Sequence, residues 1–211
     1  MNNSTIAVAL AMTLCGAASA NVVTFGTKAD FDGQGTIVYN SNFSDFSGNF
    51  TWPSNPFTRG DVTYTSAVNL TVGAGTGYSI GNVQTVMTND YWSPLKGTIL
   101  SNINEYDLFG FDAAVTSGPI SITLNTNLGQ YLYSNLSIPN GSPNFAFEGF
   151  KASAGEYFTG FRIDSLGSGY LVGMTNVEVG VAGSSVPEPA TILLTGVGLI
   201  GLFAIRRKKN V

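Results

Sequence analysis

Histidine is absent from this chain of 211 residues, and the only cysteine, Cys15, lies in the N-terminal segment. Without histidine, Ser-His-Asp and Cys-His catalysis are excluded, as are histidine-ligated zinc, copper and iron sites. If the segment before Asn21 is removed on export, the remaining chain has no cysteine and can form no disulfide. Carboxylate chemistry is what remains for a catalytic role, and no cofactor is expected.

Charge is also scarce. Charged residues make up 10% of the chain, with 9 lysines and arginines against 13 aspartates and glutamates. Four of the nine basic residues, Arg206 to Lys209, stand together near the C-terminus, so the central region is strongly acidic. Binding of nucleic acid requires clustered cations, so nucleic acid is not an expected partner. For the same reason, charge alone is not expected to hold an anionic polysaccharide.

The central region has no long amphipathic helical pattern, which disfavours alternating strand-and-helix folds. Short β-branched and aromatic segments instead recur at roughly eight to twelve residues, with turn residues between them. One helical turn is expected at residues 27–31, capped by Thr27. The fold class predicted is all-β, an antiparallel, jelly-roll-like β-sandwich. Its strands are expected at residues 36–39, 62–66, 68–72, 106–114, 120–124, 130–133, 144–150, 157–163, 170–174 and 175–181.

Both ends of the chain predict processing on export. Residues 6–14 are apolar, and Ala18-Ser19-Ala20 has the small-residue pattern of a signal-peptidase site. We therefore expect a signal peptide at residues 1–20 and a sandwich ectodomain at residues 21–181.

The last part of the chain contains three features in a fixed order. Residues 182–189 form an expected linker that ends in Pro187-Glu188-Pro189, and an uncharged apolar run follows at residues 190–205. At about 1.5 Å per residue, this run makes a helix of roughly 24 Å, which thinning of the bilayer and snorkelling of the basic ends can fit to a membrane. The cations that follow predict a cytoplasmic tail at residues 206–211. They are Arg206, Arg207, Lys208 and Lys209.

This tail closely resembles the PEP-CTERM sorting signal of Gram-negative bacteria. The resemblance implies recognition by an exosortase-type membrane enzyme as processing partner. It also implies a membrane-anchored precursor that is matured to the cell surface or to an exopolysaccharide matrix. An ordinary C-terminal membrane anchor is the alternative interpretation.

A fainter resemblance concerns the end of the ectodomain. The blocks Gly149-Phe150, Glu156 to Ile163 and Gly173 to Val177 resemble the closing hairpin of many PEP-CTERM ectodomains. Thr175 stands where an aspartate is usual in that pattern. The resemblance implies a sandwich similar to lectin-like and carbohydrate-binding domains.

Scattered carboxylates allow a glycoside hydrolase as one hypothesis, because that reaction needs two carboxylates about 5–10 Å apart. The alternative is that these acids are solubilising surface charge, and we therefore expect a non-enzymatic protein. The candidates are Glu105, Glu148, Glu156, Asp112 and Asp164.

Two further patterns could form binding sites. Asp30-Phe31-Asp32-Gly33 has the alternating carboxylates of a calcium loop but no closing glutamate, so a helix end followed by a turn is the alternative for Asp30 and Asp32. Trp52, Tyr91 and Trp92 lie in turn-rich segments, where exposed rings could stack on sugars. In the alternative interpretation, the two tryptophans close the ends of the sandwich core.

Overall fold

The computed structural model describes nine parts of the chain: residues 21–46, 50–73, 84–88, 90, 92–100, 105–115, 119–136, 145–166 and 172–183. The expected signal peptide, Tyr91, the linker from residue 184 onward, the membrane helix and the basic tail lie outside the described residues. Within the described residues, no helix has the length and apolar character needed to cross a bilayer.

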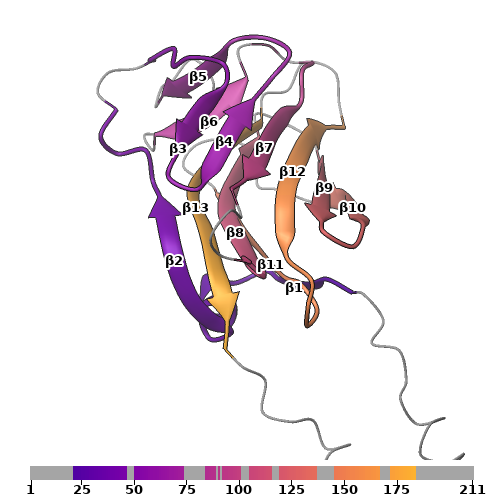
Figure 1. The fold of residues 1–211 in the computed structure, drawn as a ribbon. Helices are drawn as coiled ribbons and strands as arrows, with labels where there is room; N and C mark the ends of the chain where they lie inside the picture. The colour runs from indigo at the N-terminus through magenta and orange to yellow at the C-terminus, as the bar shows by residue number, and fades with distance from the viewer. Residues whose placement is uncertain are drawn as a thin grey trace, which may run out of the picture.

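The described residues form two antiparallel sheets, and this confirms the predicted all-β sandwich (Figure 1). Sheet A runs in the order β1 (Val23–Phe25), β11 (Ala146–Lys151), β8 (Leu108–Val115), β13 (Val172–Ala182), β6 (Thr85–Thr88) and β5 (Leu70–Gly73), and β2 (Gly35–Ser41) also pairs with β13. Sheet B runs in the order β10 (Gln130–Leu136), β9 (Ile120–Thr126), β12 (Phe158–Ser165), β7 (Leu95–Ile99), β4 (Val62–Thr65) and β3 (Phe57–Arg59).

Most expected strands are present, with two kinds of difference. The segments expected at 170–174 and 175–181 form one strand, β13, which passes through a register shift between Thr175 and Glu178. Asn176 absorbs this irregularity with a φ of 46°, a conformation that asparagine tolerates better than most residues. Strands β1, β3, β6 and β7 were not predicted, because they are short or interrupted by lysine and glycine.

The expected closing hairpin is wrong. Strand β12 pairs with β7 and β9 in sheet B, whereas β13 pairs with β8, β2 and β6 in sheet A. The chain therefore crosses from one sheet to the other between them. The two segments face each other across the core, where residues of both are buried.

Aromatic rings from both sheets fill the centre of the sandwich. Phe109 of β8 stacks on Phe161 of β12 with ring centroids 5.0 Å apart, and it contacts Phe111 at 5.4 Å. All three side chains are buried, as the period-two spacing of Phe109 and Phe111 predicts for a strand with one face inside. Each such ring removes a large apolar surface from water and fixes the spacing of the sheets.

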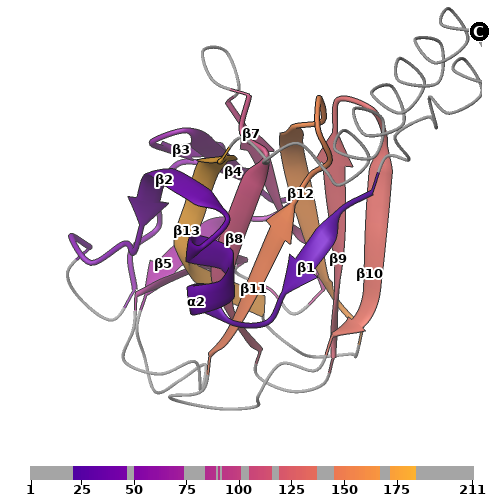
Figure 2. The ribbon, with the colours of Figure 1, turned by 90° about the horizontal axis from the view of Figure 1, so that it is seen from below.

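The short helix α2 (Lys28–Asp32) covers part of the outer face of sheet A, against β11, β2 and β1 (Figure 2). Thr27 caps it as expected by accepting a hydrogen bond from the Asp30 backbone N–H. Phe31 is fully buried against Gly110 and Gly149, where an added Cβ would lie 3.0 Å and 2.8 Å from its ring. The two glycines thus make the hollow that receives the helix.

A charged pair lies under the same helix. Lys28 Nζ donates to both carboxylate oxygens of Glu178 at 2.7 Å, and Asn40 donates to Oε1. Glu178 is 1% exposed, and burial raises its pKa above the usual value although the attraction of Lys28 works against the rise. For Lys28, burial lowers the pKa, but the bonds to Glu178 and Asp32 outweigh it and raise the pKa.

Candidate functional site

Both tryptophans have side chains that project into solvent. Trp52 is 65% exposed and Trp92 is 73% exposed. The interpretation that they close the ends of the core is therefore wrong for both. Tryptophan is rarely left this exposed, because its ring is a large apolar surface. Two such rings make candidate contacts for a ligand.

The segment that carries Trp52 is held to the body of the protein. Thr51 and Val72 exchange two backbone hydrogen bonds of 2.7 Å and 2.8 Å, which join the segment to strand β5. Further along, the Asn55 side chain donates to the carbonyl oxygens of Ser66 and Val68 at 2.8 Å and 2.6 Å. The backbone on both sides of Trp52 is thus fixed while its ring is free.

The turn that carries Trp92 is built around the carboxylate of Asp90. Its Oδ1 accepts hydrogen bonds from the backbone N–H groups of Trp92 and Ser93, at 3.3 Å and 2.8 Å. Its Oδ2 accepts from the Ser93 hydroxyl at 2.9 Å. This is the local geometry that makes aspartate a turn residue. A ring presented on a fixed backbone loses little conformational entropy when a ligand binds.

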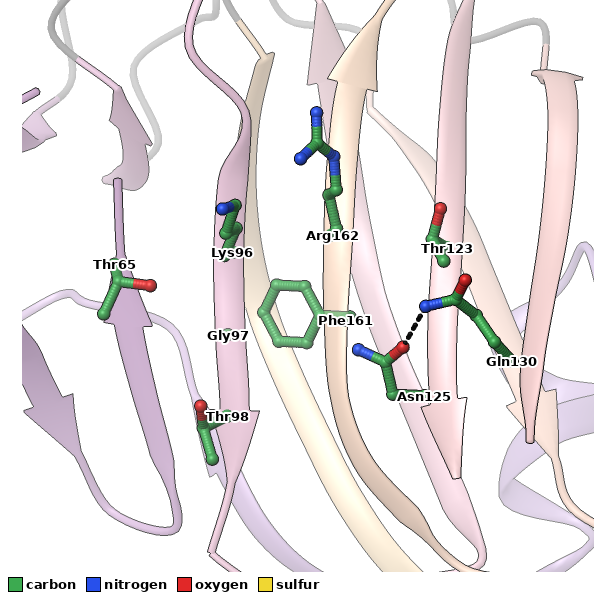
Figure 3. A pocket seen from close by; sticks show the side chains of 9 residues that line it. All are labelled: Thr65, Lys96, Gly97, Thr98, Thr123, Asn125, Gln130, Phe161 and Arg162. Atoms are coloured by element: carbon green, nitrogen blue, oxygen red, sulfur yellow. Dashed lines mark hydrogen bonds between the residues drawn. The ribbon is translucent and has the colours of Figure 1, made fainter. Parts of the chain in front are cut away.

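A second candidate lies on the outer face of sheet B, where polar side chains surround a depression of about 310 Å³ (Figure 3). One row of paired residues crosses four neighbouring strands, namely Thr65, Lys96, Arg162 and Thr123. A second row contains Thr98, Gly160, Asn125 and Gln130. Gly160 has no side chain, so the second row is open between Thr98 and Asn125. We call this surface the polar face and define it by Thr65, Lys96, Thr98, Thr123, Asn125, Gln130 and Arg162.

The floor of the depression is formed by Gly97 and Phe161, a cross-strand pair on β7 and β12. The Phe161 ring occupies the space that a side chain at position 97 would need, because an added Cβ would lie 2.2 Å from two ring carbons. Phe161 is only 1% exposed. The groups that a ligand would meet here are therefore mainly hydroxyls, amides and cations.

The two cations of the polar face differ in their partners. Arg162 donates to both oxygens of Asp164 at 2.6 Å, and this hydrogen bonding raises the pKa of Arg162. The Lys96 side chain is exposed and, within the described part of the chain, its ammonium group forms no ion pair or hydrogen bond. Opposite, Gln130 donates to Asn125 at 2.7 Å and orients that amide (Figure 3). This face was not predicted from the sequence, although the alternation in Leu95-Lys96-Gly97-Thr98-Ile99 is a strand signal.

The five acids considered for glycoside hydrolysis lie in different surroundings. Asp112 of β8 and Glu148 of β11 are one register position apart on neighbouring strands, so their side chains point to opposite faces of sheet A. Glu156 is buried, and its Oε1 accepts from Thr126 at 2.6 Å and from Tyr131 at 2.7 Å, which raises the pKa of Tyr131 to about 12. Asp112 accepts from Asn176. No acid is among the nine residues that line the depression on sheet B.

The remaining three acids have unrelated environments. Asp164 is the partner of Arg162. Glu148, on β11, is half-buried, and burial raises its pKa. Glu105 is exposed and lies before β8.

Asp30 and Asp32 lie in helix α2, two positions apart. Residues at this spacing do not share a helix face. Asp30 accepts a hydrogen bond from the Thr27 hydroxyl at 2.7 Å, and Asp32 pairs with Lys28 at 2.9 Å. Among the described residues, no group of three or more acidic, cysteine or histidine residues is placed to hold a metal ion.

The C-terminal tail matches a known protein family model. The family model described as the PEP-CTERM protein-sorting motif matches residues 185–208. The chain carries a PEP-CTERM sorting motif. The match contains Pro187, Glu188 and Pro189 and ends one residue before Lys209. A PEP-CTERM motif implies an exported, membrane-anchored precursor that an exosortase processes for the cell surface.

The PEP-CTERM motif covers only the tail. Comparison of the chain with the curated proteins gives no significant match. Among solved structures, a carbohydrate-binding module of family 29 matches at 10% identity with a TM-score of 0.39, covering 62% of this chain and 86% of the module. Two variants of a family 29 module match at 9% and 11% identity, each with a TM-score of 0.38. They cover 62% and 67% of this chain, and 84% and 99% of their own.

Proposed function

We propose that this protein is a non-enzymatic component of the cell surface or exopolysaccharide matrix of a Gram-negative bacterium. In this proposal, a signal peptide at residues 1–20 starts export, and the apolar run at residues 190–205 stops transfer. The basic residues that follow stay in the cytoplasm. An exosortase then releases a jelly-roll-like sandwich to its destination. The observation that carries the proposal is the sorting motif at residues 185–208.

The test is maturation of the chain in its host. We expect intact mass to show two cuts, one after Ala20 and one near Pro187-Glu188-Pro189, with the product in the surface or medium fraction. Replacing Arg206 to Lys209 with glutamine should leave unprocessed precursor, because the cytoplasmic cations fix orientation. A control with Lys96→Gln and Lys151→Gln removes ectodomain charge and should mature normally. Normal maturation of the tail variant would contradict the proposed topology.

A second candidate function is carbohydrate binding through the tryptophans. It is favoured by the exposure of Trp52 and Trp92 on segments with a fixed backbone. A flat apolar ring on a fixed backbone can stack on the face of a pyranose. The proposed ligand is therefore a polysaccharide of the matrix to which the protein is delivered.

Polysaccharide pull-down with single alanine variants tests this function. Trp52→Ala and Trp92→Ala should each weaken binding by about tenfold, since an apolar ring that a ligand covers contributes on the order of 1.5 kcal/mol. Their melting temperatures should stay unchanged. Leu128→Ala, which removes another exposed apolar side chain, is the matched control and should bind normally. Equal binding by all three variants would exclude the tryptophans as the site.

A further inference from the structure

We propose that the polar face of sheet B is a separate binding site for an acidic polysaccharide, with Lys96 as the ion-pair partner of a uronate carboxylate. The site does not involve the tryptophans. The proposed surface location supplies only the biological setting of this site. Binding can be measured on the purified protein, independently of that location.

The basic residues of the described chain differ in whether their side chains have a partner within the protein. Lys28, Arg59 and Arg162 each form an ion pair with a carboxylate of this chain. Lys151 donates a hydrogen bond to Gln34. Of the five basic residues within the described residues, Lys96 alone has no such partner there, and it borders the depression. A cation without a protein partner can pair with a ligand anion at no loss of an internal contact.

Lys96 is surrounded by side chains that can bind the hydroxyls of a sugar. Thr65, Thr98 and Thr123 present hydroxyls, which both donate and accept hydrogen bonds. Asn125 and Gln130 add amides on the far side of the depression. This mixture of donors and acceptors complements the hydroxyls of a sugar, whereas an apolar ligand would leave the same groups unsatisfied.

The single unpaired charge of the polar face fits a ligand that binds through one carboxylate and its neighbouring hydroxyls. Asp164 neutralises Arg162, so the polar face offers one unpaired positive charge. Nucleic acids carry a phosphate on every nucleotide, and their binding depends on several cations together. A uronate residue carries its one carboxylate beside several ring hydroxyls, so a single residue of such a polysaccharide matches one lysine among threonines and amides.

The experiment measures binding of the processed protein to polygalacturonate and to the same polymer after reduction of its carboxyl groups. We expect binding to the acidic polymer, weakened by added salt, and at least tenfold weaker binding to the reduced polymer. Lys96→Gln should lose about tenfold in affinity for the acidic polymer, because a charge-assisted contact is lost. Lys151→Gln removes the same charge from sheet A and should change the affinity less than about twofold.

The controls distinguish this site from the one proposed above. Trp52→Ala and Trp92→Ala should leave polygalacturonate binding unchanged, so failure of either proposal can be seen without the other. Equal losses in Lys96→Gln and Lys151→Gln would show a general effect of net charge and overturn the site. Equal binding of the reduced polymer would overturn the acidic ligand. Melting temperatures within error of the unmodified protein verify that each variant is folded.

Discussion

The outer faces of the two sheets differ in how far they are covered. On sheet A, helix α2 buries Phe31 in a hollow made by glycines and closes over Glu178. On sheet B, threonines, amides and two cations surround an open depression. Both faces contain charged side chains, but those of sheet A are satisfied within the protein, while Lys96 on sheet B has no partner among the described residues.

This difference shows which face is available to a ligand. Covering a sheet face with a helix removes apolar surface from water and adds to stability. Leaving the other face polar costs little, since its groups remain hydrated. We therefore expect the outer face of sheet A to contribute to stability and that of sheet B to binding, and substitutions on the two faces test these roles.

The largest effect is expected from Phe31→Ala. Removing this fully buried ring leaves a cavity between α2 and sheet A, and such changes cost about 3–5 kcal/mol of unfolding free energy. Urea denaturation measures the loss. Trp92→Ala removes a still larger ring that is exposed, and it should cost less than about 0.5 kcal/mol. Equal losses in the two variants would contradict the view that α2 is a structural cover.

A smaller loss is expected from Gly97→Ala, in the floor of the polar face. The new methyl would collide with the Phe161 ring, which is held by Phe109 and Tyr64. Overpacking of this kind costs about 1–3 kcal/mol. Gly129→Ala is the matched control, because an added Cβ there meets nothing within 4 Å. Thermal denaturation of both variants checks the prediction, and a stable Gly97→Ala protein would show that the ring can move.

Local patterns in the sequence predicted the parts of the fold that depend on nearby residues. The cap at Thr27, the strand around Phe109 and Phe111, and the strand that begins at Ile120 all follow from spacing and side-chain type. The strands with which they pair could not be predicted from these local patterns. The expected hairpin failed because pairing is decided by packing across the core, which brings β12 beside β7, a strand more than fifty residues away in the chain.

The polar face could not be predicted for the same reason. Its residues come from five strands between Thr65 and Arg162, and only the register of sheet B places them together. A shift of one residue in any strand would turn its side chain inward. The exposure of the two tryptophans could not be predicted either, because the burial of a side chain in a loop depends on which segments pack over it. The sorting motif was predictable because its features lie in one continuous stretch.

The buried pair under α2 predicts a pH dependence. Burial raises the folded-state pKa of Glu178 above its usual value, so the folded protein favours the protonated acid. The stability that this group contributes is therefore present at low pH and lost as the pH rises through the folded-state pKa. Glu178→Gln removes this dependence. We expect the unfolding free energy of the variant, relative to the unmodified protein, to increase from acidic to neutral pH and then level off.

Urea denaturation at several pH values measures this difference. Asp30→Asn is the control, because Asp30 is an exposed residue of the same helix. A Glu178→Gln variant that loses stability relative to the unmodified protein as the pH rises would show that the ion pair with Lys28 outweighs burial.

The smallest change in stability is expected from Asp164→Asn on the outer face of sheet B. Its ion pair with Arg162 is partly exposed, and such pairs contribute about 0–1 kcal/mol. The affinity for an acidic ligand should change more than the free energy of unfolding, because the substitution frees Arg162 and leaves two unpaired cations beside the depression. Affinity for polygalacturonate should rise about two- to threefold at low salt, opposite in sign to Lys96→Gln, and the gain should vanish as salt is added. The titration used for Lys96→Gln measures it, and a loss of affinity would mean that Asp164 itself contacts the ligand.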